Sequence, residues 1–193
     1  FVTITPHGEL FDPQTIALIG EIRDEFERLE SVYSVISMLD VPLVKNVDGT
    51  LAEISKNFRL LESKDVNLDR ARIELTTSPI YRDLVVDTKG TLTAIQIFLN
   101  NDEEFLEAQR RRNELIDKRE SEGLSSLERT ELDRILSSYA RMKDRADNAN
   151  HIAVAEIRAV MENYAHKGTL YLGGVPMIVD DMVTFIGNDL VTF

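Results

Sequence analysis

The chain has 193 residues, and its 34 Asp and Glu against 22 Lys and Arg give a net charge of −12. A surface this acidic repels phosphate backbones, which argues against nucleic acid as a partner. The sequence contains no cysteine, which excludes disulfides, thiol nucleophiles and cysteine-ligated zinc. Its 43% hydrophobic residues are typical of a globular domain rather than a disordered one.

The two ends of the sequence indicate a piece of a longer protein. The chain starts at Phe1 without a methionine or a signal peptide, and it ends at Phe193 inside an apolar run. No stretch reaches the roughly 18 uninterrupted apolar residues of a membrane-spanning helix. We therefore expect a domain excised from a larger protein.

The first quarter of the chain is predicted to be strand, helix and strand. Residues 1–6 alternate apolar and polar side chains, and Asp12-Pro13 is typical of a helix start, with the helix running to about residue 30. Residues 32–44 are apolar on both faces, as in a central strand. We expect this strand to pair in parallel with the first, through a right-handed crossover.

The next region is less regular. Apolar residues repeat at helical spacing over 51–61, and 70–76 predicts one or two further helical turns. Ser78-Pro79 predicts a short helix that ends near residue 84. A β-hairpin is expected over 84–99, with Gly90 supplying the positive φ of its turn.

Residues 102–167 are predicted to form two helices joined by a tight turn. Gly123 is typical of a helix end, and Ser125 followed by Glu128 has the spacing of a capping box. The apolar residues of the second helix step by three and four in a heptad-like seam: Leu132, Ile135, Tyr139, Met142, Ala146, Ala149, Ala153, Ile157 and Val160. We expect an antiparallel helical hairpin that partly projects from the body.

The chain then returns to a strand over 169–172 and a last helix that begins at Pro176. The order predicts an α+β fold with a ferredoxin-like β-α-β-β-α-β plan, whose second helix is enlarged into the hairpin. We expect one domain, 1–193, with a body of 1–101 and 168–193 and a helical hairpin of 102–167.

The patterns reveal no catalytic, cofactor or metal site. His7, His151 and His166 lack metal-ligand spacing, and no serine stands in a nucleophile elbow. Gly173-Gly174 lacks the other residues of a phosphate loop, and Asp180-Asp181 would oppose an anion there. Pattern alone indicates a soluble α+β domain without visible chemistry.

Specific residues add a resemblance. Residues 172–182, Leu-Gly-Gly-Val-Pro-Met-Ile-Val-Asp-Asp-Met, with Asn188-Asp189-Leu190, resemble the segment of RND superfamily exporters of the MMPL-like branch that leads into their second membrane helix. Further segments are similar to the same family in the same order: 2–13, 35–43, 78–86 and 87–95.

The resemblance implies the first periplasmic porter domain of a bacterial inner-membrane exporter of hydrophobic or lipidic molecules. Export would be driven by ion flux through membrane helices outside this chain, so the domain would be no enzyme and hold no cofactor. Its partners would be the substrate, the neighbouring periplasmic domain and other protomers.

The resemblance also places a hinge at Gly173, Gly174 and Pro176, unless these residues simply satisfy the turn. Asp180 and Asp181 would contact substrate, protons or a partner loop, or else form a solvated helix face. Two other functions stay open. One is an interaction module that docks a partner or protomer through the acidic hairpin. The other is a small-molecule enzyme, which requires a pocket with perturbed titratable groups.

Overall fold

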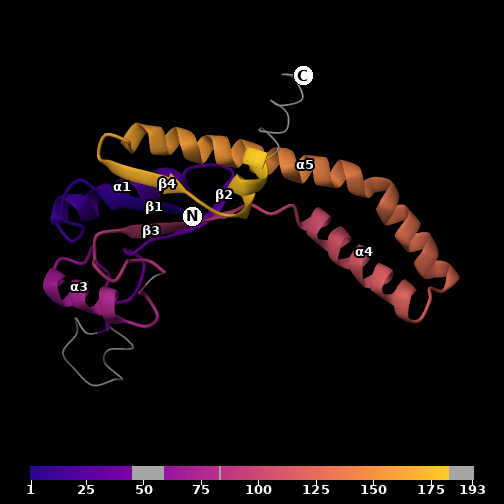
Figure 1. The fold of residues 1–193 in the computed structure, drawn as a ribbon, viewed down its shortest axis with the longest axis horizontal. Coiled ribbons are helices and arrows are strands. Elements are labelled where there is room, and N and C mark those ends of the chain that lie inside the picture. Colours follow the sequence, from indigo (N-terminus) through magenta and orange to yellow (C-terminus); the bar gives the residue numbers. More distant parts are fainter. Residues whose placement is uncertain (45–58, 83, 183–193) are drawn as a thin grey trace.

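The computed structural model describes residues 1–44, 59–82 and 84–182 (Figure 1). The four strands of its sheet are β1 (Val2–Pro6), β2 (Val32–Ile36), β3 (Thr93–Leu99) and β4 (Gly168–Leu172). Its helices are α1 (Pro13–Glu27), α3 (Leu68–Thr77), α4 (Glu103–Ser121) and α5 (Ser126–Tyr164), followed by helical residues 175–182. The predicted α+β class is therefore confirmed.

The strands lie in the order β2-β3-β1-β4, and every neighbouring pair is antiparallel. The predicted parallel pairing of the first two strands is wrong, because β3 lies between β1 and β2. These two strands still run in the same direction, since each is antiparallel to β3. The connection between them through α1 therefore spans one intervening strand.

The main core lies between one face of the sheet and the helices α1 and α5 (Figure 1). Ile4 and Ile95 point into it from β1 and β3 and are buried. The helices contribute apolar residues at helical spacing, namely Ile19, Ile22 and Phe26 of α1 and Ile157 and Val160 of α5. Each such side chain contributes about 1.5–3 kcal/mol when fully buried, so α1 and α5 are held on the sheet chiefly by this face.

The expected central strand over 32–44 is instead a short edge strand that ends at Ile36. Asp40 terminates it, because its carboxylate accepts hydrogen bonds from the backbone N–H (2.8 Å) and hydroxyl (2.7 Å) of Ser37. Met38 and Leu39 are fully buried in the turn that follows. Their burial explains the apolar pattern that resembled a two-faced strand.

Residues 68–92 follow the sequence in part. α3 confirms the helical turns expected around 70–76, but Ser78 is its C-cap and no helix of the described chain begins at Pro79. The residue before a proline disfavours the helical conformation, so this dipeptide ends a helix here. The 84–99 hairpin is confirmed: the Asp87 N–H donates to Leu92 and Gly90 has a φ of 68°. The helix expected over 51–61 lies largely outside the described residues.

α4 and α5 form the predicted antiparallel hairpin, which extends beyond the sheet (Figure 1). Its tip begins with the predicted capping box, in which Ser125 and Glu128 exchange hydrogen bonds. A small apolar cluster holds the helices together there, formed by Leu115, Leu124, Leu132 and Ile135. The predicted apolar seam of α5 therefore packs against α4 near the tip and against the sheet beyond Ala153. No helix among the described residues is long and apolar enough to cross a membrane.

Candidate functional site

The residues singled out from the sequence lie where the last strand passes into the final helix. β1 and β4 pair along their whole length, and the pairing continues to their ends. The Phe1 amino group donates to the Gly173 carbonyl (3.0 Å), and the Gly173 N–H donates to the Phe1 carbonyl (2.9 Å). The start of β1 is thus fixed beside the start of helix 175–182.

At both glycines of this junction, the folded structure itself disfavours a side chain. A Cβ on Gly173 would lie 2.6 Å from Cζ of Phe1, closer than real atoms approach. Gly174 has a φ of 122°, a conformation that side chains of L-residues rarely adopt. Pro176 stands in the first turn of the helix, where its missing N–H costs nothing. The contact with Phe1 and the geometry of the turn therefore account for these three residues.

Asp180 and Asp181 attach helix 175–182 to α5. The guanidinium of Arg158 donates to Asp180 (3.2 Å) and to Asp181 (2.6 Å), and Nδ1 of His151 contacts Asp180 as well. Only 8% of the Asp180 side chain is exposed, against 53% of Asp181. Asp180 is therefore a buried anion between two basic side chains rather than part of a solvated face. We call Arg158, His151, Asp180 and Asp181 the junction clamp.

A cavity of about 340 Å³ lies beside the junction clamp. One wall consists of polar α5 residues and the other of apolar residues from helix 175–182. The lining residues are Asp147, Asn148, Asn150, His151, Val175, Pro176, Val179 and Asp180. The two helices therefore do not pack closely along this stretch.

A second cavity, of about 450 Å³, lies on the sheet face opposite the core. Its lining is mostly apolar: Phe1, Thr3, Leu84, Val85, Val86, Asp87, Leu92, Ala94 and Gln96. Burial raises the pKa of Asp87, but hydrogen bonds from the N–H groups of Leu92, Thr91 and Lys89 outweigh it and lower the pKa. The Asp87 carboxylate thus stabilises the hairpin turn. Because its lining is mostly apolar, the cavity suits an apolar ligand or partner.

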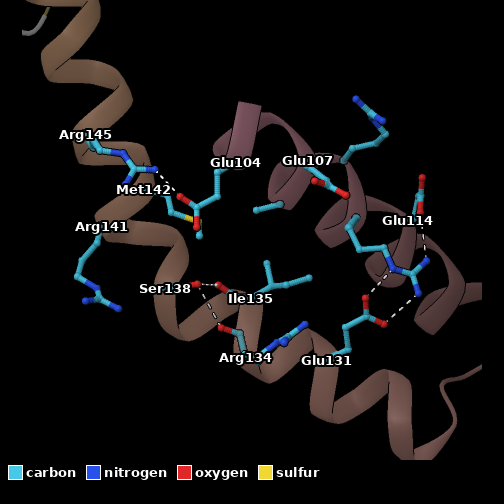
Figure 2. A pocket seen from close by; sticks show the side chains of 13 residues that line it. Glu104, Glu107, Glu114, Glu131, Arg134, Ile135, Ser138, Arg141, Met142 and Arg145 are labelled. Carbon is cyan, nitrogen blue, oxygen red and sulfur yellow. Dashed lines mark hydrogen bonds and ion pairs between the residues drawn. The ribbon is translucent and has the colours of Figure 1, made fainter. Parts of the chain in front are cut away.

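A third hollow is a charged groove of about 820 Å³ between α4 and α5 (Figure 2). Within it Arg111 donates to both carboxylate oxygens of Glu131 (2.9 Å each), and Arg145 donates to Glu104 (2.7 Å). The bond from Arg111 lowers the pKa of Glu131. Beyond the groove, Arg145 also donates to Asp102 (2.7 Å), the N-cap of α4. These pairs hold the helices together where apolar contacts are few.

The contacts that the structure shows at the junction are ion pairs and hydrogen bonds. Among the described residues no group of three or more His, Asp or Glu side chains is placed to hold a metal ion. Sequence reasoning missed Arg158 and His151, which supply the α5 side of the junction clamp. Their spacing of seven residues, two helical turns on one face of α5, was the signal that pointed to a shared partner.

The structure thus brings Gly173, Gly174, Pro176, Asp180 and Asp181 into one junction and adds two α5 residues to it. One cavity beside it lies between α5 and helix 175–182, and the other is lined in part by Phe1 and Thr3 of the β1 end. No known family model, curated protein or solved structure matches the chain.

Proposed function

We propose that this chain is the first periplasmic porter domain of an RND superfamily exporter of the MMPL-like branch, which exports hydrophobic or lipidic molecules. The resemblance of residues 172–182 motivates the proposal. The observation that carries it is the β1–β4 pair, which sets Phe1 beside Gly173. A domain inserted between two successive membrane helices needs its entry and exit to lie together.

The strand order β2-β3-β1-β4, with helices on one face, supports the ferredoxin-like plan of such a domain. The hairpin of α4 and α5 occupies the place of its second helix. The open sheet face, with its apolar cavity, is where we place contact with an apolar substrate or the neighbouring domain.

In this proposal the junction clamp couples the membrane helix to the porter domain. Arg158 belongs to α5, which is packed into the core through Ile157 and Val160. A displacement of helix 175–182 is therefore passed to the body through Asp180 and Asp181. The glycines before it set the angle at which the helix leaves the sheet.

Location is tested first. Because the chain has no cysteine, a Leu127→Cys variant of the full-length protein carries one reactive thiol in this domain, at a side chain that is 81% exposed. We expect a membrane-impermeant maleimide to label it in intact cells whose outer membrane is permeabilised. Labelling that needs lysis of the inner membrane contradicts the proposal.

Coupling is tested in the same full-length protein with Arg158→Ala, which removes the contacts of Arg158 with Asp180 and Asp181 and leaves only that of His151 with Asp180. We expect export of a hydrophobic fluorescent dye to fall at unchanged expression. The matched control is Arg119→Ala, at an exposed arginine of α4 that forms no ion pair with the residues the structure describes. Equal dye export by the wild type, Arg158→Ala and Arg119→Ala excludes a coupling role for the clamp.

A second function, an interaction module, is favoured by one observation. The hairpin extends away from the sheet, and α4 packs mainly against α5 (Figure 1). Deletion of residues 105–148 then leaves a folded body and abolishes a protein contact. If the deletion abolishes dye export while every contact persists, the hairpin belongs to the transport path.

A further inference from the structure

The junction clamp contains one side chain of a type whose charge changes near neutral pH. Histidine ordinarily gains or loses its proton between about pH 5 and 8, whereas arginine and aspartate keep their charges over that range. In the clamp this side chain is His151, and it is 62% exposed, so protons reach it from solvent. The Asp180 carboxylate that it contacts is only 8% exposed. A change of charge at His151 therefore acts on an anion that water and salt screen little.

Each oxygen of the Asp180 carboxylate has its own partner on α5. Nδ1 of His151 contacts Oδ1, and Nη1 of Arg158 donates to Oδ2 at 3.2 Å. Arg158 also donates to Asp181 at 2.6 Å, so its charge is shared between two carboxylates. Among the described residues, His151 is the group that contacts Oδ1. The state of this imidazole therefore decides how well Oδ1 is satisfied.

The contact between His151 and Asp180 changes in kind when the imidazole takes up a proton. A neutral imidazole has one N–H, which donates to Oδ1 only when that proton is on Nδ1. When the proton is on Nε2, a lone pair of Nδ1 faces the carboxylate instead. The imidazolium carries a proton on both nitrogens, so Nδ1 always donates, and the hydrogen bond is then strengthened by charge.

The charged side chains around the imidazole come from α5 and from helix 175–182. They comprise three carboxylates and two cations: Asp147, Asp180, Asp181, Lys143 and Arg158. Asp147, one turn before His151, lines the same cavity and is paired with Lys143. Of these five groups only Asp180 contacts the imidazole. A positive charge on His151 therefore acts chiefly on Asp180.

We infer that the junction clamp is pH-sensitive, because protonation of His151 strengthens the attachment of helix 175–182 to α5. The added attraction exists only with the imidazolium, so it is present below about pH 6 and is lost as the pH rises through about pH 7. Arg158 holds the helix on both sides of this range, so pH adjusts the strength of the clamp without releasing the helix. The inference concerns the chain by itself and does not depend on export.

Amide hydrogen exchange of the 193-residue chain between about pH 5.5 and pH 7.5 tests the inference. Protection factors, which remove the intrinsic effect of pH on exchange, are compared for the amides of residues 178–182. This set begins with Ile178, whose N–H donates to the Gly174 carbonyl. We expect their protection to fall about two- to five-fold as the pH rises, the effect of an exposed ion pair, while the protection of α1 stays constant.

Two substitutions at His151 separate its charge from its side chain. His151→Gln cannot become charged and is expected to show the weaker protection at every pH, whereas His151→Arg is always charged and is expected to show the stronger one. His166→Gln, at an exposed histidine beyond the end of α5, is the matched control and should keep the pH dependence of the wild type. Wild-type protection of residues 178–182 that does not change with pH, or that changes equally in His151→Gln, overturns the inference.

Discussion

The ring of Phe1 lies against the backbone of Gly173, so that a Cβ at Gly173 would come within 2.6 Å of Cζ. Because Phe1 is 52% exposed, its ring can turn aside, and Gly173→Ala is expected to lower the free energy of unfolding by only about 0.5–1.5 kcal/mol, the cost of an unfavourable side-chain rotamer. Chemical denaturation measures it.

The double variant with Phe1→Ala removes the clashing ring and is expected to recover most of the loss. Gly8→Ala is the control, because a Cβ there meets only Thr15 at an ordinary 3.8 Å. If Gly173→Ala is as harmless as Gly8→Ala, the packing of Phe1 at the junction is not as described.

The junction clamp is tested by Asp180→Asn. The change removes the charge of the carboxylate that Arg158 and His151 share, and because their side chains are 41% and 62% exposed the expected cost is within about 1 kcal/mol. We expect faster amide hydrogen exchange over residues 175–182, with the exchange of α1 unchanged. Asp181→Asn is the matched control and should have a smaller effect, because its side chain is 53% exposed. Equal exchange in both variants would show that Asp180 does not hold the helix.

The pH dependence of the hairpin follows from Glu128. Hydrogen bonds from Lys118 (2.7 Å) and from the Ser125 N–H (2.9 Å) lower its pKa from 4.5 to about 2. Because the pKa is lower in the folded state, the stabilisation is complete above about pH 4.5 and is lost as the pH falls toward 2. We expect the exchange protection of residues 125–130 to fall across this window.

Glu128→Gln is expected to show weaker protection already at pH 5 and little further change down to pH 2. Glu122→Gln, at the C-cap of α4, should behave as the wild type. Protection in the wild type that stays constant between pH 5 and pH 2 would contradict the assignment.

The apolar cluster at the tip should unfold separately from the body. Leu132 is 4% exposed, and Leu132→Ala is expected to cost about 2–5 kcal/mol locally. Because α4 packs mainly on α5, hydrogen exchange should rise over 103–135 and stay unchanged in the sheet. Leu127→Ala, at an 81% exposed position, is the control and should change neither. A uniform increase over the whole chain would show that hairpin and body unfold as one unit.

Local signals predicted much of this fold. The caps at Asp12 and Ser125 and the turn at Gly90 act within a few residues, so the helix and hairpin boundaries could be read from the sequence. The strand over 32–44 was misread because burial in a turn and burial in a sheet give the same apolar pattern. Only the carboxylate of Asp40 distinguishes them, through bonds that no pattern shows.

Long-range partners could not be read in this way. For Asp180 the sequence left two alternatives open, a contact with substrate, protons or a partner loop and a solvated helix face. Its partners in the structure stand 22 and 29 residues earlier, beyond the reach of a local pattern. The insertion of β3 between β1 and β2 likewise depends on pairing across the whole chain. The glycines of the junction were found as a motif, but the ring that makes Gly173 necessary belongs to the first residue.

α5 is one unbroken helix of 39 residues, about 58 Å long at 1.5 Å per residue. Its second half is anchored in the core, its first half carries α4, and Arg158 lies on the anchored side. The helix is therefore a continuous arm that is held at the sheet. A force applied at the tip of the hairpin is transmitted along α5 to helix 175–182, because no loop interrupts α5 between the tip and Arg158.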